Sequence, residues 1–156
     1  MEVRRVTFEE ELARHGRFLF TNVGGSMLPL LRESRDLMLI ERRPTDAEGR
    51  ALRCRKYDAV LYRRGESYIL HRVLKVLPDG YVICGDNNWR REYDIRDPQI
   101  IGVMTAFVRD GVETPVTNRW YRAYVHLWCD LYPVRAAILF GRDALSRLKR
   151  RVWRKR

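Results

Sequence analysis

Between residues 17 and 108 the chain alternates short apolar runs with polar turns. Six runs rich in Val, Ile, Leu and Tyr are bounded by Gly, Pro and Asp, a pattern typical of β-strands. They predict strands at 18–23, 36–41, 58–62, 68–77, 80–84 and 100–108. The residues at 63–66 and 78–80 predict hairpin turns, the second with Gly80 at positive φ.

Helical patterns occupy the two ends of the chain. Thr7 and Glu10 fit a capping box that begins a short surface helix, and Gly16 fits its end. After Pro115 the pattern is helical again, and Pro133 is expected to separate two helical segments. Apolar positions in the second segment recur at spacings of three and four, as on one face of an amphipathic helix: Val134, Ile138, Gly141, Leu145, Leu148 and Val152.

These elements predict a mainly β fold of the α+β class. Short strands joined by hairpins favour a coiled antiparallel sheet or partial barrel, with a short N-terminal helix and a C-terminal amphipathic helix. A chain of 156 residues fits one core-forming domain. We expect that domain at 1–118 and a basic helical tail at 119–156.

The charge of the chain is concentrated in that tail. The whole chain has 31 Lys and Arg against 20 Asp and Glu, a net charge of +11. Residues 119–156 hold eleven Lys and Arg and two acids, so +9 of this charge lies in the last quarter of the chain. Such a segment is attracted to phosphate groups, those of lipids or of nucleic acid.

Three segments carry residues suited to catalysis. Gly24 and Gly25 precede Ser26 after a predicted strand, which presents a hydroxyl on a tight turn beside backbone N–H groups. His71 lies within the predicted strand 68–77, and Asp86 follows the strand 80–84. Taken singly, each has an ordinary structural explanation: a glycine turn, a structural histidine and an Asx turn.

Taken together and in this order, the segments resemble the signal peptidases, most closely the endoplasmic-reticulum and archaeal branch. That family has a Ser-Met-x-Pro box, a basic residue followed by Arg-Val, and a Gly-Asp-Asn box. The corresponding segments are Ser26-Met-Leu-Pro29, His71-Arg-Val73 and Gly85-Asp-Asn-Asn88, and Ile100-Ile-Gly-Val-Met104 is similar to the family's closing strand. The resemblance covers about residues 18–108 and implies a serine endopeptidase, a hydrolase without cofactor or metal.

The resemblance also assigns roles to particular residues. It implies Ser26 as nucleophile, His71 as general base and Asp86 as a residue that shapes the site. A further acid that orients the histidine is expected a few residues later, at Glu92 or Asp94. Gly24, Gly25 and Met27 are expected to line the substrate and oxyanion region. Many members of the family have Ser-Gly-Ser where this chain has Gly24-Gly25-Ser26, so one hydroxyl of the oxyanion hole is missing.

The predicted partners are a peptide or leader substrate and an anionic membrane surface. The 25 residues before Ser26 contain too many charges for a spanning helix, and residues 123–140 contain Asp130, Pro133 and Arg135. We therefore expect 119–156 to lie on a membrane, with the enzyme cytoplasmic or peripheral on the inner face. The alternatives are a tail packed on the sheet, a spanning tail, a nucleic-acid-binding module and a peptide-binding pseudo-enzyme. No nucleic-acid motif supports the nucleic-acid alternative.

Overall fold

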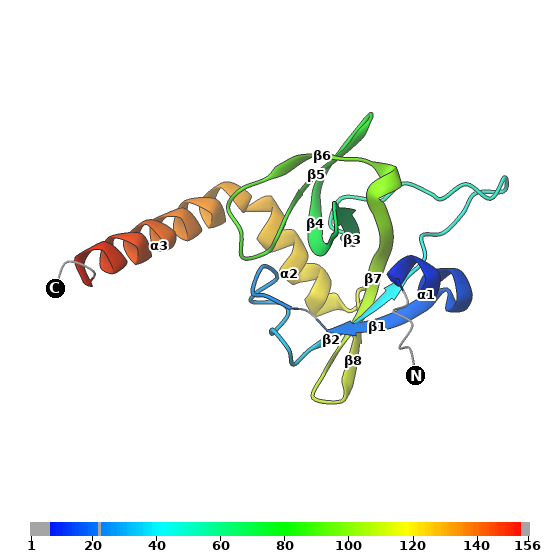
Figure 1. Ribbon diagram of the computed structural model, residues 1–156, viewed down its shortest axis with the longest axis horizontal. Helices are drawn as coiled ribbons and strands as arrows, with labels where there is room; N and C mark the ends of the chain where they lie inside the picture. Colours follow the sequence, from blue (N-terminus) through cyan, green and yellow to red (C-terminus); the bar gives the residue numbers. More distant parts are fainter. Residues whose placement is uncertain (1–6, 22, 154–156) are drawn as a thin grey trace.

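The computed structural model of the chain describes residues 7–21 and 23–153, with side chains to residue 150 (Figure 1). Asn22 of the first predicted strand, the Val152 side chain and the last three basic residues lie outside that part. The strands are β1 (Arg17–Thr21), β2 (Leu37–Glu41), β3 (Ala59–Arg64), β4 (Ser67–Leu77), β5 (Gly80–Cys84), β6 (Glu92–Ile95), β7 (Ile100–Arg109) and β8 (Val112–Pro115). The helices are α1 (Phe8–His15), α2 (Arg119–Asp130) and α3 (Tyr132–Trp153), with a 3₁₀ turn at Asp97–Gln99.

The eight strands form one antiparallel sheet that does not close into a barrel. Their order is β1-β2-β7-β3-β4-β5-β6, and β8 pairs with β7. Register shifts interrupt four of the strand pairs, between β2 and β7, β3 and β7, β4 and β5, and β5 and β6. Such bulges bend and twist strands, which coils the sheet. The predicted α+β class with an antiparallel sheet is confirmed.

All six predicted strands are present, with ends that differ by a few residues. Two short strands were not predicted, β6 and β8. The sequence of β6, Glu-Tyr-Asp-Ile, lies at the sheet edge and is mostly polar, with only Ile95 buried, so it lacks the apolar alternation of a half-buried strand. The predicted positive φ at Gly80 is wrong; a Cβ there would lie 2.5 Å from the carbonyl oxygen of Ile95. Glycine is required for close approach of β6, not for turn geometry.

The N-terminal helix has the predicted capping box and ends at Gly16, whose φ is 70°. It is more than a surface helix, because Leu12 is buried and the Phe8 ring stacks on Phe18 with centroids 4.8 Å apart. This helix therefore covers the β1 end of the sheet.

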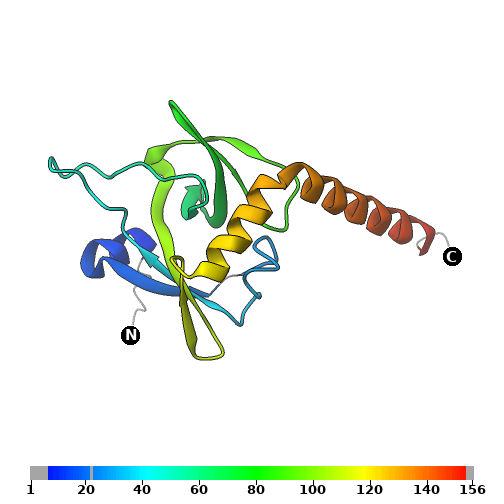
Figure 2. The same ribbon diagram turned by 180° about the vertical axis from the view of Figure 1, so that it is seen from behind.

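The two C-terminal helices behave differently from each other. Helix α2 packs against the sheet and contributes Tyr121, Val125 and Cys129 to the main core. Helix α3 begins beside the loop that follows β5 and then extends away from the body, as Figures 1 and 2 both show. Among the described residues, no helix is long and apolar enough to cross a membrane.

Candidate active site

Ser26 lies in a turn between β1 and β2 whose neighbouring side chains pack into the core. The side chains of Met27 and Leu31 are fully buried, which anchors the segment and leaves Ser26 partly exposed above it. Gly24 has φ 100°, a conformation that residues with a Cβ rarely adopt. Its N–H donates to Glu33 Oε1 at 2.8 Å, so this group is already engaged and does not serve an oxyanion.

Asn87 holds the backbone on both sides of Ser26. Its N–H donates to the Ser26 carbonyl oxygen at 2.7 Å, and its Nδ2 donates to the Gly25 carbonyl oxygen at 2.9 Å. Arg142 on α3 donates in turn to Asn87 Oδ1 at 2.9 Å. The sequence indicated the Gly-Asp-Asn box but gave no sign that Asn87 fixes the serine turn.

His71 lies on β4 with its imidazole buried between that turn and β6. A Cβ built on Gly85 would lie 2.7 Å from the carbonyl oxygen of Ser26 and 2.9 Å from Nε2 of His71. The Ser26 carbonyl oxygen and His71 Nε2 therefore lie on the same side of Gly85, both close to the position that a Cβ of residue 85 would occupy. A side chain at position 85 would clash with both, which explains the glycine there.

The other ring nitrogen of His71 contacts Glu92. Nδ1 lies 2.9 Å from Glu92 Oε1, and the Tyr62 hydroxyl donates to Glu92 Oε2 at 2.7 Å. Arg64 also pairs with Oε2. Asp94 is exposed and makes no contact with the imidazole among the described residues. Of the two acids that the sequence left open, the structure brings Glu92 to the histidine; Tyr62 and Arg64 were not predicted.

Asp86 belongs to a different network. Its carboxylate accepts two hydrogen bonds from Arg72, from Nε at 2.8 Å and from the terminal nitrogen at 2.7 Å, and both side chains are fully buried. The Tyr124 hydroxyl donates to the same carboxylate at 3.0 Å. Trp128 Nε1 donates to the Asp86 backbone carbonyl at 2.8 Å. Asp86 therefore ties the Gly85–Asn88 turn to β4 and α2, and makes no hydrogen bond to the imidazole.

The protonation state of His71 suits a proton acceptor. Burial is the main cause that lowers the pKa of His71 to about 4; Asp86 opposes this shift and Arg64 adds to it. The ring is therefore neutral at pH 7. Because a carboxylate only accepts, the ring proton belongs on Nδ1 facing Glu92, and Nε2 faces the serine turn with its lone pair.

Two backbone donors at the turn have no partner in the described part of the chain, the N–H groups of Ser26 and Met27. The Met27 side chain points into the core, so only its backbone is placed to meet a substrate. No hydrogen bond joins Ser26 Oγ to His71 Nε2 among the described residues; such contacts commonly tighten only when substrate is bound.

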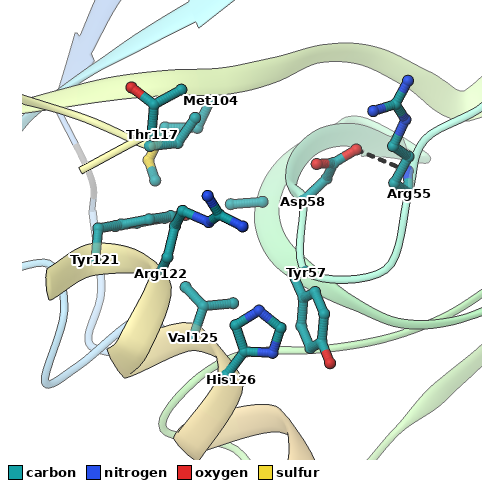
Figure 3. A pocket seen from close by; sticks show the side chains of 11 residues that line it. Arg55, Tyr57, Asp58, Met104, Thr117, Tyr121, Arg122, Val125 and His126 are labelled. Atoms are coloured by element: carbon teal, nitrogen blue, oxygen red, sulfur yellow. Dashed lines mark hydrogen bonds between the residues drawn. The ribbon is translucent and has the colours of Figure 1, made fainter. Parts of the chain in front are cut away.

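A pocket of about 340 Å³ lies elsewhere, between α2 and the start of β3 (Figure 3). Asp58 lines it and accepts a hydrogen bond from the Arg55 N–H at 2.7 Å; burial raises the pKa of this carboxyl. None of Ser26, His71 and Glu92 lines this pocket. The three cysteines are free and buried, and burial raises the pKa of each thiol to about 11, so they are poor nucleophiles.

Comparisons of the chain with models of protein families, with curated proteins and with solved structures find no match. The resemblance to the signal peptidases therefore rests on the three sequence boxes.

Proposed function

We propose that the chain is a serine endopeptidase, similar to the signal peptidases, in which Ser26 is the nucleophile and His71 the general base. One observation supports this above the others. The buried, neutral imidazole presents Nδ1 to the Glu92 carboxylate and Nε2 to the turn that carries Ser26. An acid, an imidazole and a hydroxyl in that order form the arrangement by which serine peptidases activate their nucleophile.

The proposed reaction has two halves. Ser26 Oγ attacks the scissile carbonyl carbon while its proton passes to His71 Nε2, and the tetrahedral oxyanion lies against the N–H groups of Ser26 and Met27. His71 then protonates the leaving amine as the C–N bond breaks, which leaves an acyl ester on Ser26. Water, deprotonated by the same nitrogen, hydrolyses the ester and restores the serine hydroxyl. Two backbone donors replace the missing Ser-Gly-Ser hydroxyl, and one such donor contributes about 3–4 kcal/mol in other enzymes.

The proposed substrate is an extended peptide or leader with small residues near the cleavage point, as the resemblance implies. Cleavage at the inner face of the cytoplasmic membrane stays a prediction of the sequence. The test is to compare cells that carry the wild-type chain with cells that carry Ser26→Ala, by mass spectrometry of peptide termini. We expect a defined set of peptides to accumulate uncut with Ser26→Ala; identical peptide sets in the two strains would count against the proposal.

Glu92→Gln is expected to lower kcat/KM about 10²-fold, because an amide does not stabilise the imidazolium that forms during catalysis and can favour the wrong tautomer. The measurement is the steady-state rate on a peptide found as above. Asp94→Asn is the matched control, since it makes the same change two residues further along β6, at an exposed position. Equal rates for the two variants would remove Glu92 from the mechanism.

The pH dependence of kcat/KM should follow the unusual titration of His71. A base is active when unprotonated, so a pKa of about 4 keeps the rate level from pH 7 down to about pH 5, where an ordinary histidine would already be mostly protonated. Below this the rate should fall as the ring gains a proton.

Arg64 supplies a further check on that profile. Its positive charge lowers the pKa of His71, so Arg64→Gln should move the acid limb of the profile toward neutral pH. Arg63→Gln is the control, because the neighbouring arginine points to the opposite face of β3 and lies near Glu9 and Glu66. An acid limb that stays in place in Arg64→Gln, or that already lies near pH 6.5 in the wild type, would contradict this environment for the base.

A further inference from the structure

One row of exposed apolar side chains continues from α2 into α3. It begins near Trp120, which is 73% exposed, and is here called the apolar stripe: Leu127, Leu131, Val134, Ile138, Leu145 and Leu148. Within α3 its members are separated by three, four or seven residues, so they lie along one side of that helix. Leu127 and Leu131 precede them at the end of α2. Ile138 is 66% exposed and Leu145 60%, and large apolar side chains rarely stand exposed in such a continuous row.

The stripe lies outside the side of the helices that packs against the body. The contacts with the body come from a second row, in which Tyr121, Val125, Cys129, Tyr132 and Leu139 are buried. Each residue turns an α-helix by about 100°, so Val134 lies on roughly the opposite side from Tyr132. The stripe is therefore not covered by any element of the described chain, and α3 carries it outward from the body (Figure 2).

The charges around the stripe indicate what covers it. Residues 119–156 carry +9, from eleven Lys and Arg against Asp130 and Asp143. Two copies of this segment packed stripe to stripe would bring two such charges together, which opposes self-association. An apolar row flanked by cations complements a bilayer surface with anionic headgroups, where the apolar side chains enter the boundary and the cations meet phosphate.

We propose that α2 and α3 dock the protein on an anionic lipid bilayer through the apolar stripe, with the helices parallel to the surface. Helix α3 also contacts the loop after β5, whose Asn87 holds the serine turn: Arg142 donates to Asn87 Oδ1, and Trp89 Nε1 donates to Asp143 Oδ2 at 3.1 Å. Docking therefore places the candidate active site beside the membrane surface, at a height set by these contacts. The proposal rests on the exposed row and its charge, and does not require the peptidase reaction.

The test is sedimentation of the purified full chain with vesicles. The two compositions are pure phosphatidylcholine and phosphatidylcholine with 30% phosphatidylglycerol, a mixture of roughly physiological anionic content. We expect binding to the anionic vesicles, weakened by added salt because the cations are screened. Leu145→Glu should lower the partition coefficient at least about tenfold, since it removes an apolar anchor and adds a repelled charge.

Ser146→Glu is the matched control, because it adds the same charge at the adjacent exposed position, off the stripe. It should weaken binding only about two- to threefold, through charge alone. Equal effects of Leu145→Glu and Ser146→Glu would overturn docking by the stripe. So would failure to bind anionic vesicles, or a dimer in sedimentation velocity that only Leu145→Glu dissociates, which would assign the stripe to a second copy of the chain. None of these outcomes depends on peptide cleavage.

Discussion

Ser26→Ala is expected to lower kcat/KM for peptide cleavage by on the order of 10⁴-fold or more, and His71→Ala to do the same. The hydroxyl is a poor nucleophile without a base, and the base has no proton to accept without the hydroxyl, so the two groups act as a unit. The double variant Ser26→Ala/His71→Ala should therefore be no slower than either single variant. If the loss of kcat/KM in the double variant equals the product of the two single losses, the residues act separately.

The controls for this experiment come from the same chain. Ser67→Ala removes an exposed hydroxyl at the start of β4, four residues before the proposed base, and His15→Ala removes an exposed imidazole on α1. Both should keep the wild-type rate. The free energy of unfolding of Ser26→Ala, measured by thermal unfolding, should lie within about 0.5 kcal/mol of the wild-type value. The Ser26 side chain is only partly buried and makes no hydrogen bond among the described residues. Wild-type turnover by Ser26→Ala would end the peptidase proposal.

The strands were predictable because their signal is local. Apolar alternation and turn residues define β4 and β5, and the hairpin between them follows from a short connection. The third member of the site was not predictable, because Glu92 and Asp94 are two residues apart, a spacing that regular alternation would place on one face of a strand. The register shift between β5 and β6 breaks that alternation: Glu92 pairs with Ile83 and lies at the imidazole, whereas Asp94 is exposed.

The same argument explains how one strand serves two networks. Successive residues of β4 point to opposite faces, so His71 meets Glu92 on one side and Arg72 meets Asp86 on the other. The sequence boxes indicated that Asp86 lies close to the serine and the histidine. They did not indicate on which side of β4 its carboxylate lies. The inner face of α2 did carry a usable signal, since Tyr121, Val125 and Cys129 recur every four residues, as a core-facing helix requires.

Asp86→Ala is expected to lower the free energy of unfolding by about 3–5 kcal/mol, because it leaves the Arg72 guanidinium buried without its counter-ion. Tyr124 loses its acceptor in the same change. For a chain of this length the melting temperature should fall by about 10 °C or more. Urea unfolding measures the loss, and Asp94→Ala is the control. Because Asp94 is exposed, its substitution should lower the free energy of unfolding by less than about 0.5 kcal/mol.

A double substitution tests the cause of this loss. If the cost comes from an uncompensated buried charge, then Arg72→Leu/Asp86→Leu should be more stable than Asp86→Leu alone, since it also removes the guanidinium that loses its carboxylate in Asp86→Leu. At a temperature where it stays folded, Asp86→Asn should retain cleavage far above the level of Ser26→Ala, because Asp86 makes no hydrogen bond to the His71 ring. Loss of cleavage in folded Asp86→Asn to the level of Ser26→Ala would make Asp86 part of the chemistry. A double variant less stable than Asp86→Leu would show that Arg72 stabilises the fold by more than neutralising Asp86.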